Sequence, residues 1–161
     1  MKVSVIGLGY IGLPTAAVIA SKDIKVFGFD VNENVVNKIN SGHCHIIEPG
    51  LDDLVNTKVN KSYLVADSNI NISDVYIIAV PTPFIKDKAK IPKPNLSYIE
   101  NASRKLAKFL KKGDLIILES TSPVGTTEKM QSWLMEERDD LKFPAITKNP
   151  DVNIAYCPER V

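Results

Sequence analysis

The 161-residue sequence predicts an α/β fold of the doubly wound type, in which a parallel sheet of about six strands carries helices on both faces. Short apolar runs of strand length alternate with segments of helical periodicity along the whole chain. The first apolar run leads directly into a glycine-rich turn that opens a helix. Hydrophobic residues make up 44% of the sequence, which is enough for the core of a single domain over residues 1–161.

The glycine turn has the spacing of a dinucleotide-binding fingerprint. Gly7, Gly9 and Gly12 form G-x-G-x-x-G after an apolar strand expected over Val3–Ile6, and Asp30 follows Gly12 by eighteen residues. In this reading Gly7 permits a tight turn, Gly9 lets the backbone approach a pyrophosphate, and Gly12 lets the helix pack on the strand. The three glycines alone are a weak signal, and the acidic residue at the expected distance strengthens it.

The ligand chemistry follows from the groups at this turn. The backbone N–H groups around Tyr10, Ile11 and Gly12 lie at a helix N-terminus, where the helix dipole favours an anion. Asp30 is placed to accept hydrogen bonds from ribose hydroxyls, and Val31–Glu33 offer no cation for a 2′-phosphate, so NAD is preferred over NADP. The alternative is a turn that only packs the strand on the helix, with Asp30 capping the next helix.

The remaining elements alternate as the fold class requires. The helical segments carry apolar residues at helical spacing, and two of them are followed by a glycine as a stop signal. We expect helices over Leu13–Ser21, Asn32–Asn40, Leu51–Val55, Leu96–Lys112 and Thr126–Glu137. Strand-sized apolar runs predict strands over Val3–Ile6, Lys25–Phe29, Tyr63–Ala66, Val75–Val80, Asp114–Glu119 and Val152–Tyr156. The basic residues crowded into the second half of the fourth helix are typical of a solvated face.

Two of these strands end in segments suited to ligand contact. The strand over Val75–Val80 stops at Pro81, Thr82 and a second proline, and the next strand runs into a hydroxyl-rich segment that contains Thr121. The carboxyl ends of parallel strands meet at one edge of the sheet, where ligands bind. We therefore expect Thr82 to contact the cofactor, with its hydroxyl near the ribose on the nicotinamide side.

Other features exclude several classes of function. A net charge of +1 provides no basic field for nucleic acid, and the longest apolar runs are far too short to span a membrane. The sequence enters its first strand without a signal-peptide layout, so we expect a cytoplasmic protein. We expect no metal site, since His43 and His45 lack evident further ligands, and the basic loop Lys86–Lys93 reads as solvated surface. Cys44 and Cys157 form no metal or disulfide pattern, and Cys157 is expected to be an inert thiol at the end of a buried strand.

Five motifs, in order along the whole chain, carry a resemblance to a known family. They are Gly7–Pro14, Glu48–Leu51, Val80–Pro83, Glu119–Gly125 and Cys157–Val161. In these motifs the chain resembles the NAD-binding domain of the UDP-glucose/GDP-mannose dehydrogenase family. Five ordered motifs are far more specific than one glycine fingerprint.

The resemblance implies an activity and a division of labour. Members of the family oxidise the primary alcohol of a nucleotide sugar, such as a UDP sugar, to a carboxylate in two hydride transfers to NAD, through a thioester on a cysteine. That cysteine and its assisting lysine and asparagine belong to middle and C-terminal parts of the family, which the 161 residues do not include. The resemblance therefore implies that the chain alone is inactive, and that the full-length enzyme is a homodimer.

The resemblance also assigns roles to residues of this sequence. The residues that it implies for contact with NAD are Tyr10, Ile11, Asp30, Pro81, Thr82 and Thr121. Thr121 also positions the water that hydrolyses the thioester. Glu159, Arg160 and Val161 begin the substrate-binding segment, with Glu159 near the reacting carbon.

Two other functions remain as alternatives. A 3-hydroxyacid or 6-phosphogluconate-type dehydrogenase shares this kind of N-terminal Rossmann unit, although the Glu119–Gly125 segment argues against it. A free-standing NAD-sensing regulatory module is the second alternative. A glycine–cysteine segment further along the reading frame would identify the nucleotide-sugar dehydrogenase.

Overall fold

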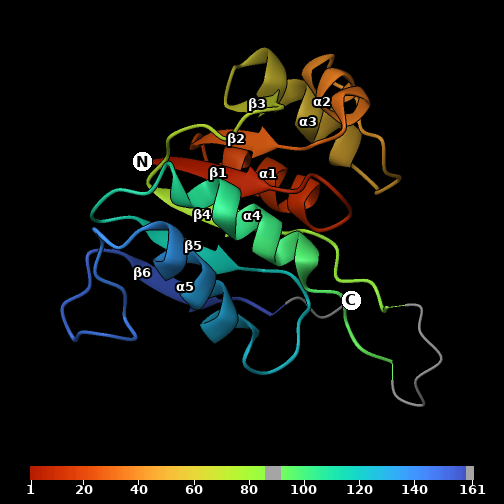
Figure 1. The fold of residues 1–161 in the computed structure, drawn as a ribbon. Coiled ribbons are helices and arrows are strands. Elements are labelled where there is room, and N and C mark those ends of the chain that lie inside the picture. Colours follow the sequence, from red (N-terminus) through yellow and green to blue (C-terminus); the bar gives the residue numbers. More distant parts are fainter. Residues whose placement is uncertain (86–91, 159–161) are drawn as a thin grey trace.

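The computed structural model describes residues 1–85 and 92–158, which fold as a parallel sheet between two layers of helices (Figure 1). The strands of these residues are β1 (Lys2–Ile6), β2 (Lys25–Phe29), β3 (Leu64–Asp67), β4 (Val75–Ile78), β5 (Leu115–Leu118) and β6 (Asn153–Tyr156). The helices are α1 (Gly12–Ser21), α2 (Glu33–Asn40), α3 (Leu51–Asn60), α4 (Ser97–Ala107) and α5 (Thr126–Glu137). The predicted α/β class is confirmed.

The strand order makes the sheet doubly wound. The six strands lie in the order β3-β2-β1-β4-β5-β6, and every neighbouring pair is parallel. The chain therefore moves outward from β1 to β3, returns to β4 beside β1, and moves outward again to β6. The reversal between β1 and β4 is the switch point at which open parallel sheets bind ligands, just beyond their carboxyl ends.

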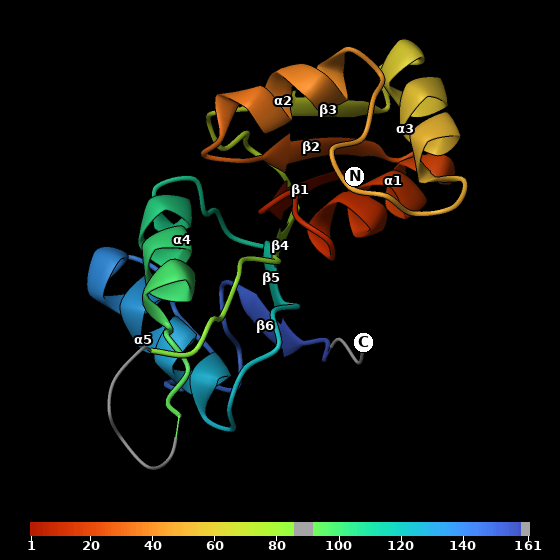
Figure 2. The same ribbon diagram turned by 90° about the vertical axis from the view of Figure 1, so that its right-hand side faces the viewer.

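Alternate residues of the strands supply the two halves of the core. Val5 faces α1, α2 and α3, whereas its neighbour Ile6 belongs to the cluster under α4 and α5. Figure 2 shows α4 and α5 together on one side of the sheet and α1 with α3 on the other. The period-two alternation of β1 thus explains why one strand supports both layers.

Two helices differ in length from the prediction. α3 continues five residues past the expected end at Val55, because Val59, one turn further on, packs against the same core. α4 stops at Ala107 instead of Lys112. Arg138 donates to the carbonyl oxygen of Ala107, the last residue of the helix (2.8 Å), and to that of Leu110 in the turn that follows (2.7 Å), so the chain turns towards β5 without further helix.

The prediction of a buried last strand is wrong. β6 pairs only with β5 in the part of the chain that the structure describes, and both Asn153 and Tyr156 are exposed. Cys157, which follows it, is also exposed, and its expected burial as a core thiol is not observed. The reason is position: the sequence pattern identified a strand but could not show that the strand lies at the edge of the sheet.

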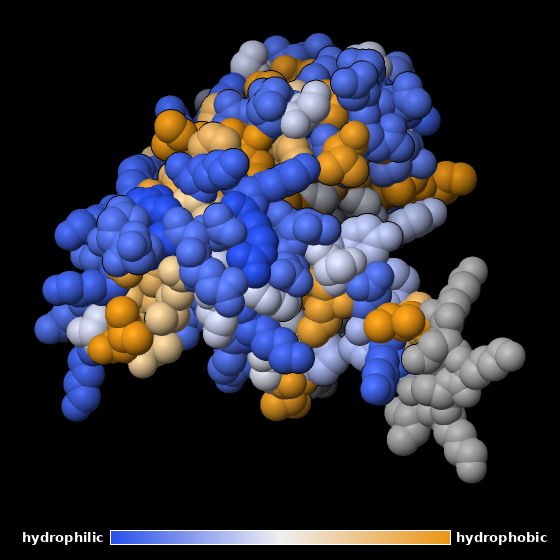
Figure 3. All heavy atoms as spheres, viewed as in Figure 1, coloured by the Kyte–Doolittle hydropathy of each residue, from blue (hydrophilic) through white to orange (hydrophobic). Residues whose placement is uncertain are grey.

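The outer face of α4 and α5 is polar. Figure 3 shows mainly hydrophilic residues over these helices. Arg104 of α4 forms an ion pair with Glu100 of the same helix (3.0 Å) and joins α4 to α5 through Glu136 (2.7 Å) and Glu137 (2.9 Å). The lysines of the predicted basic run are solvent-exposed, as predicted, although Lys108, Lys111 and Lys112 lie beyond the end of α4. Within residues 1–85 and 92–158, no helix has the length and apolar character needed to cross a membrane.

Candidate cofactor site

A large cavity lies at the carboxyl edge of the sheet, beside the switch point. It encloses about 890 Å³, and its walls come from the ends of β1, β2, β4 and β5 and from α4. The predicted residues that line it are Gly7, Gly9, Tyr10, Ile11, Asp30, Pro81, Thr82 and Thr121. The fold thus gathers side chains from four separate segments of the sequence at one site.

The glycine turn is shaped by close backbone contacts. Gly7 has φ +95°, and a Cβ atom there would lie 2.5 Å from the carbonyl oxygen of Ala79 at the end of β4. A Cβ on Gly12 would lie 1.8 Å from the carbonyl oxygen of Gly7, so α1 packs directly on the turn. Gly9 has no atom within 4 Å of its Cβ position and lines the cavity. Its backbone is therefore open to a ligand.

The N-terminus of α1 is suited to an anion. Among the described residues, the backbone N–H groups of Tyr10, Ile11 and Gly12 donate to no protein acceptor. The first turn of α1 carries no acidic residue that would oppose an anion. Free N–H groups and the positive end of the helix dipole therefore meet beside the cavity, which fits the pyrophosphate of a dinucleotide.

The Asp30 carboxylate is held in place by the backbone on both sides. Its Oδ2 accepts from the N–H of Leu8 and its Oδ1 from the N–H of Asn32, each at 2.9 Å. The first bond joins the end of β2 to the glycine turn. Asp30 does not cap α2, because the side chain of Asn32 accepts the N–H of Asn34 at 3.0 Å and is the N-cap. The carboxylate retains lone pairs that can accept from ribose hydroxyls.

The other end of the cavity is formed by the segments after β4 and β5. The hydroxyl of Thr82 donates to the carbonyl oxygen of Thr121 at 2.6 Å, and that of Ser120 donates to the carbonyl oxygen of Val80 at 2.8 Å. The hydroxyl of Thr15 in α1 donates to the carboxylate of the buried Glu119 at 2.9 Å. Side-chain hydrogen bonds thus connect β4, β5 and α1 around the site.

The structure does not place every predicted residue at this cavity, because some of them lie outside the described part of the chain. Glu159, Arg160 and Val161 are outside the described residues, as are residues 86–91 of the basic loop. Cys44 is buried beside Asp52, and burial, with the nearby carboxylate, raises the pKa of its thiol to about 11. A thiol with that pKa is a poor nucleophile near neutral pH. The described residues contain no cluster of three or more histidine, cysteine, aspartate or glutamate side chains that could hold a metal.

Sequence reasoning missed one wall of the cavity. Tyr98, Asn101, Ala102 and Lys105 line it from α4. Their spacing of three, one and three residues is that of a single helical stripe, which was a signal available in the sequence. The signal does not reveal which element the stripe faces, because that depends on the packing of α4 against the sheet.

Fold and site together define a dinucleotide-binding domain of the Rossmann type. The sequence model of the UDP-glucose/GDP-mannose dehydrogenase family, NAD binding domain, matches residues 1–161. The chain belongs to this family. The predicted membership is confirmed, and it favours the nucleotide-sugar dehydrogenase hypothesis over the two alternatives.

Individual relatives agree with the family assignment. The chain is 60% identical over 161 residues to the UDP-N-acetyl-D-mannosamine dehydrogenase of Campylobacter jejuni, with 99% of this chain and 39% of that protein covered. It is 50% identical over 160 residues to the NDP-N-acetyl-D-galactosaminuronic acid dehydrogenase of Ralstonia solanacearum, with 99% and 37% covered. The native structure of the UDP-N-acetyl-mannosamine dehydrogenase from Staphylococcus aureus matches with a TM-score of 0.87 and 35% identity, covering all of this chain and 37% of that one. The chain thus spans less than two fifths of the length of these relatives.

Proposed function

We propose that the chain is the NAD-binding domain of a nucleotide-sugar dehydrogenase that oxidises UDP-N-acetylmannosamine, or a related UDP sugar, to the uronate. The observation that carries the proposal is the cavity at the switch point, which combines a helix N-terminus for a pyrophosphate with Asp30 for a ribose. Bound NAD supplies the hydride acceptor for the two oxidation steps. The identity to two dehydrogenases of acetamido-sugar nucleotides supports this choice of substrate class.

The predicted residues at the cavity and at the adjoining N-terminus of α1 have distinct roles in this proposal. The N–H groups of Tyr10, Ile11 and Gly12 bind the pyrophosphate, and Asp30 accepts from the adenosine ribose. Pro81, Thr82 and Thr121 line the nicotinamide end, where the bond from Thr82 to the backbone of Thr121 fixes the relative position of the two loops. The hydroxyl of Thr121 donates no hydrogen bond to a described residue, so it is available to orient a water molecule.

The remaining catalytic groups are proposed to come from outside these 161 residues. Oxidation of the aldehyde requires a thiolate, and Cys44 is buried with a raised pKa while Cys157 lies on the exposed edge beyond β6. Glu159, Arg160 and Val161 are proposed to begin the substrate-binding segment. We further propose that the complete enzyme is a cytoplasmic homodimer with UDP sugar as its substrate, and that it binds neither nucleic acid nor membrane.

Calorimetric titration of the 161-residue chain tests cofactor binding. Asp30→Asn removes the charge that strengthens the ribose hydrogen bonds, and we expect the dissociation constant for NAD to rise roughly 10- to 150-fold, from a loss of about 1.5–3 kcal/mol. Asp139→Asn, a change of the same kind at an exposed site beyond α5, is the matched control and should leave the affinity within about twofold. Equal NAD affinity in Asp30→Asn and the wild type would remove Asp30 from the site.

A turnover assay tests the proposal that the remaining catalytic groups lie outside these 161 residues. We expect no NADH formation when the chain alone is mixed with NAD and UDP-N-acetylmannosamine, because positioning of the substrate contributes up to about 7–11 kcal/mol of barrier reduction and, in this proposal, comes from residues outside these 161. Addition of the separately expressed remainder of the protein should restore NADH formation. Turnover by the 161-residue chain alone would contradict the proposal.

A further inference from the structure

The stripe on α4 carries a cation to the same end of the cavity as Asp30. Lys105 is the last of the lining residues along the helix, and its ammonium group lies 5.7 Å from the centre of the Phe29 ring. Phe29 is the residue immediately before Asp30 and also lines the cavity. Lys105 and Asp30 therefore reach the same end of the site from α4 and from β2.

These two residues are the charged groups of the cavity wall. Among the described residues that line the cavity, Asp30 and Lys105 alone carry a formal charge at neutral pH. No ion pair of 4.0 Å or less involves Lys105 within residues 1–85 and 92–158. Its neighbour Arg104, in contrast, is bound by three glutamates on the outer face. The charge of Lys105 is thus not neutralised by a carboxylate of the described residues.

A second, smaller cavity continues from this point. It encloses about 230 Å³ and shares Phe29 and Lys105 with the first. Ser68, Asn69 and Lys108 also line it, so its wall offers a second cation, a hydroxyl and an amide. Lys108 does not line the larger cavity. Lys105 is therefore the cation at the junction of the two cavities.

We propose that Lys105 is a specificity-determining residue that attracts the 2′-phosphate of NADP and so opposes the discrimination exerted by Asp30. A carboxylate accepts hydrogen bonds from free ribose hydroxyls and repels a phosphate at the same position. An ammonium group cannot accept a hydrogen bond, but it attracts a phosphate. The preference for NAD then depends on the balance between two opposite charges, one on β2 and one on α4. This inference rests on the proposed function, because it requires the cavity to bind a dinucleotide.

The test compares NAD and NADP binding in a background that admits both. Asp30→Ser removes the repulsion, and we expect NADP to bind at least about tenfold more tightly to this variant than to the wild type. Adding Lys105→Met should weaken NADP binding by about fivefold while the affinity for NAD changes by less than about twofold. Lys129→Met, at an exposed lysine of α5 that lines neither cavity, is the control and should alter neither affinity. The loss at Lys105 should also shrink in high salt, since it is an interaction between charges.

A second variant at Asp30 is needed in case Asp30→Ser disrupts the glycine turn, which the Asp30 side chain stabilises. Asp30→Asn keeps an oxygen that can accept from the N–H of Leu8, and the same Lys105 comparison is made in it. Equal effects of Lys105→Met on NAD and NADP, or no effect on either, would overturn the inference, as would failure of both Asp30 variants to bind NADP better than the wild type. A wild-type chain that bound no NAD would instead overturn the proposed function.

Discussion

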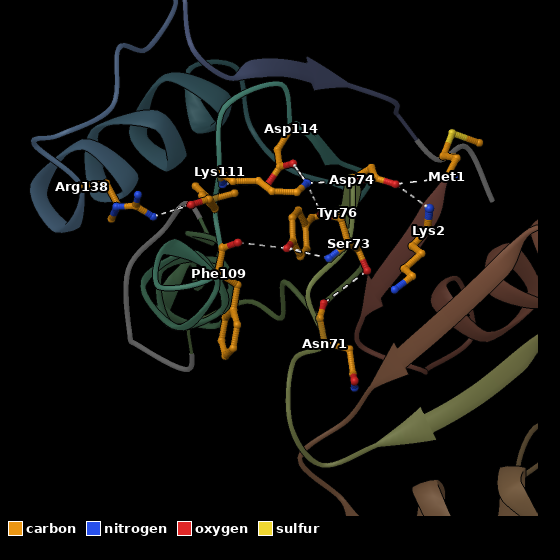
Figure 4. A network of polar contacts seen from close by, with 11 residues as sticks. Met1, Lys2, Asn71, Ser73, Asp74, Tyr76, Phe109, Lys111, Asp114 and Arg138 are labelled. Carbon is orange, nitrogen blue, oxygen red and sulfur yellow. Dashed lines mark hydrogen bonds and ion pairs between the residues drawn. The ribbon is translucent and has the colours of Figure 1, made fainter.

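Tyr76 is the centre of a polar network at the amino edge of the sheet, opposite the cavity (Figure 4). Its side chain is fully buried, and its hydroxyl accepts from the backbone N–H of Ser73 at 3.0 Å and donates to the carbonyl oxygen of Phe109 at 3.2 Å. Lys111 donates to the carbonyl oxygen of Ser73 at 2.9 Å and to the buried carboxylate of Asp114. The network thus joins the start of β4 to the segments that enter β5.

Removal of the Tyr76 hydroxyl should lower the stability of the fold by a large amount for a single atom. Tyr76→Phe leaves the ring in place but deprives the buried N–H of Ser73 of its acceptor, which costs about 1–3 kcal/mol, and it also removes a donor to Phe109. We expect the free energy of unfolding to fall by about 2–3 kcal/mol. For a chain of this size that lowers the Tm by roughly 5–10 °C.

Urea denaturation measures the effect, with the slope of the transition expected to stay constant. Tyr63→Phe is the matched control, because the Tyr63 hydroxyl makes no hydrogen bond to a described residue, and its free energy of unfolding should stay within about 0.5 kcal/mol of the wild type. NAD affinity should be unchanged in both variants. A Tyr76→Phe variant as stable as the wild type would refute the reasoning.

Three further predictions concern the glycine turn, acid stability and the thiols. Gly9→Ala should weaken NAD binding at least about tenfold without loss of stability, because its Cβ meets open cavity, whereas Gly12→Ala should reduce both, as calorimetry and urea denaturation will show. The folded-state pKa of Asp74 is lowered, first by the backbone N–H of Lys2 and then by Lys111, so its stabilising effect is present above its unfolded pKa and is lost as the pH falls through the folded value. In urea denaturation between about pH 6 and 2.5, the free energy of unfolding should decrease once the pH is below about 4. This decrease should be less steep in Asp74→Asn. With a thiol reagent at neutral pH, Cys157 should react quickly and Cys44 only slowly unless the chain is unfolded, and equal rates would contradict their assigned exposures.

The local part of the site could be predicted from the sequence because its signals are local. The glycine spacing determines a turn whose steric demands are met within a few residues, and Asp30 ends a strand whose apolar pattern is plain. Asn32 decides between the two interpretations of Asp30. Because Asn32 is the N-cap of α2, Asp30 is left to face the cavity. Element bounds were less predictable, since α4 ends where Arg138, thirty-one residues beyond Ala107, satisfies its carbonyl groups.

The non-local part of the site could not be predicted, because the signals in the sequence are local and do not show which distant segments pack together. Lys105 is distant in sequence from Asp30, and only the packing of α4 over β2 brings the two to one cavity. Likewise, the absence of a cation directly after Asp30 was read as a preference for NAD, although a cation reaches that end of the cavity from α4. The exposure of Cys157 depends on the position of β6 at the edge, which is a property of the whole sheet.

The hydrogen bonds of the site fix the walls of the cavity relative to one another. Asp30 bonds to the backbone of the glycine turn, Thr82 to the backbone after β5, and Ser120 to the backbone after β4. Each bond joins two different strand ends, so the walls are positioned by folding itself, and little ordering remains to oppose binding. Because the bonds end on backbone atoms, the arrangement tolerates changes in the lining side chains, such as those on α4. We therefore expect a substitution at Lys105 to leave the glycine turn undisturbed.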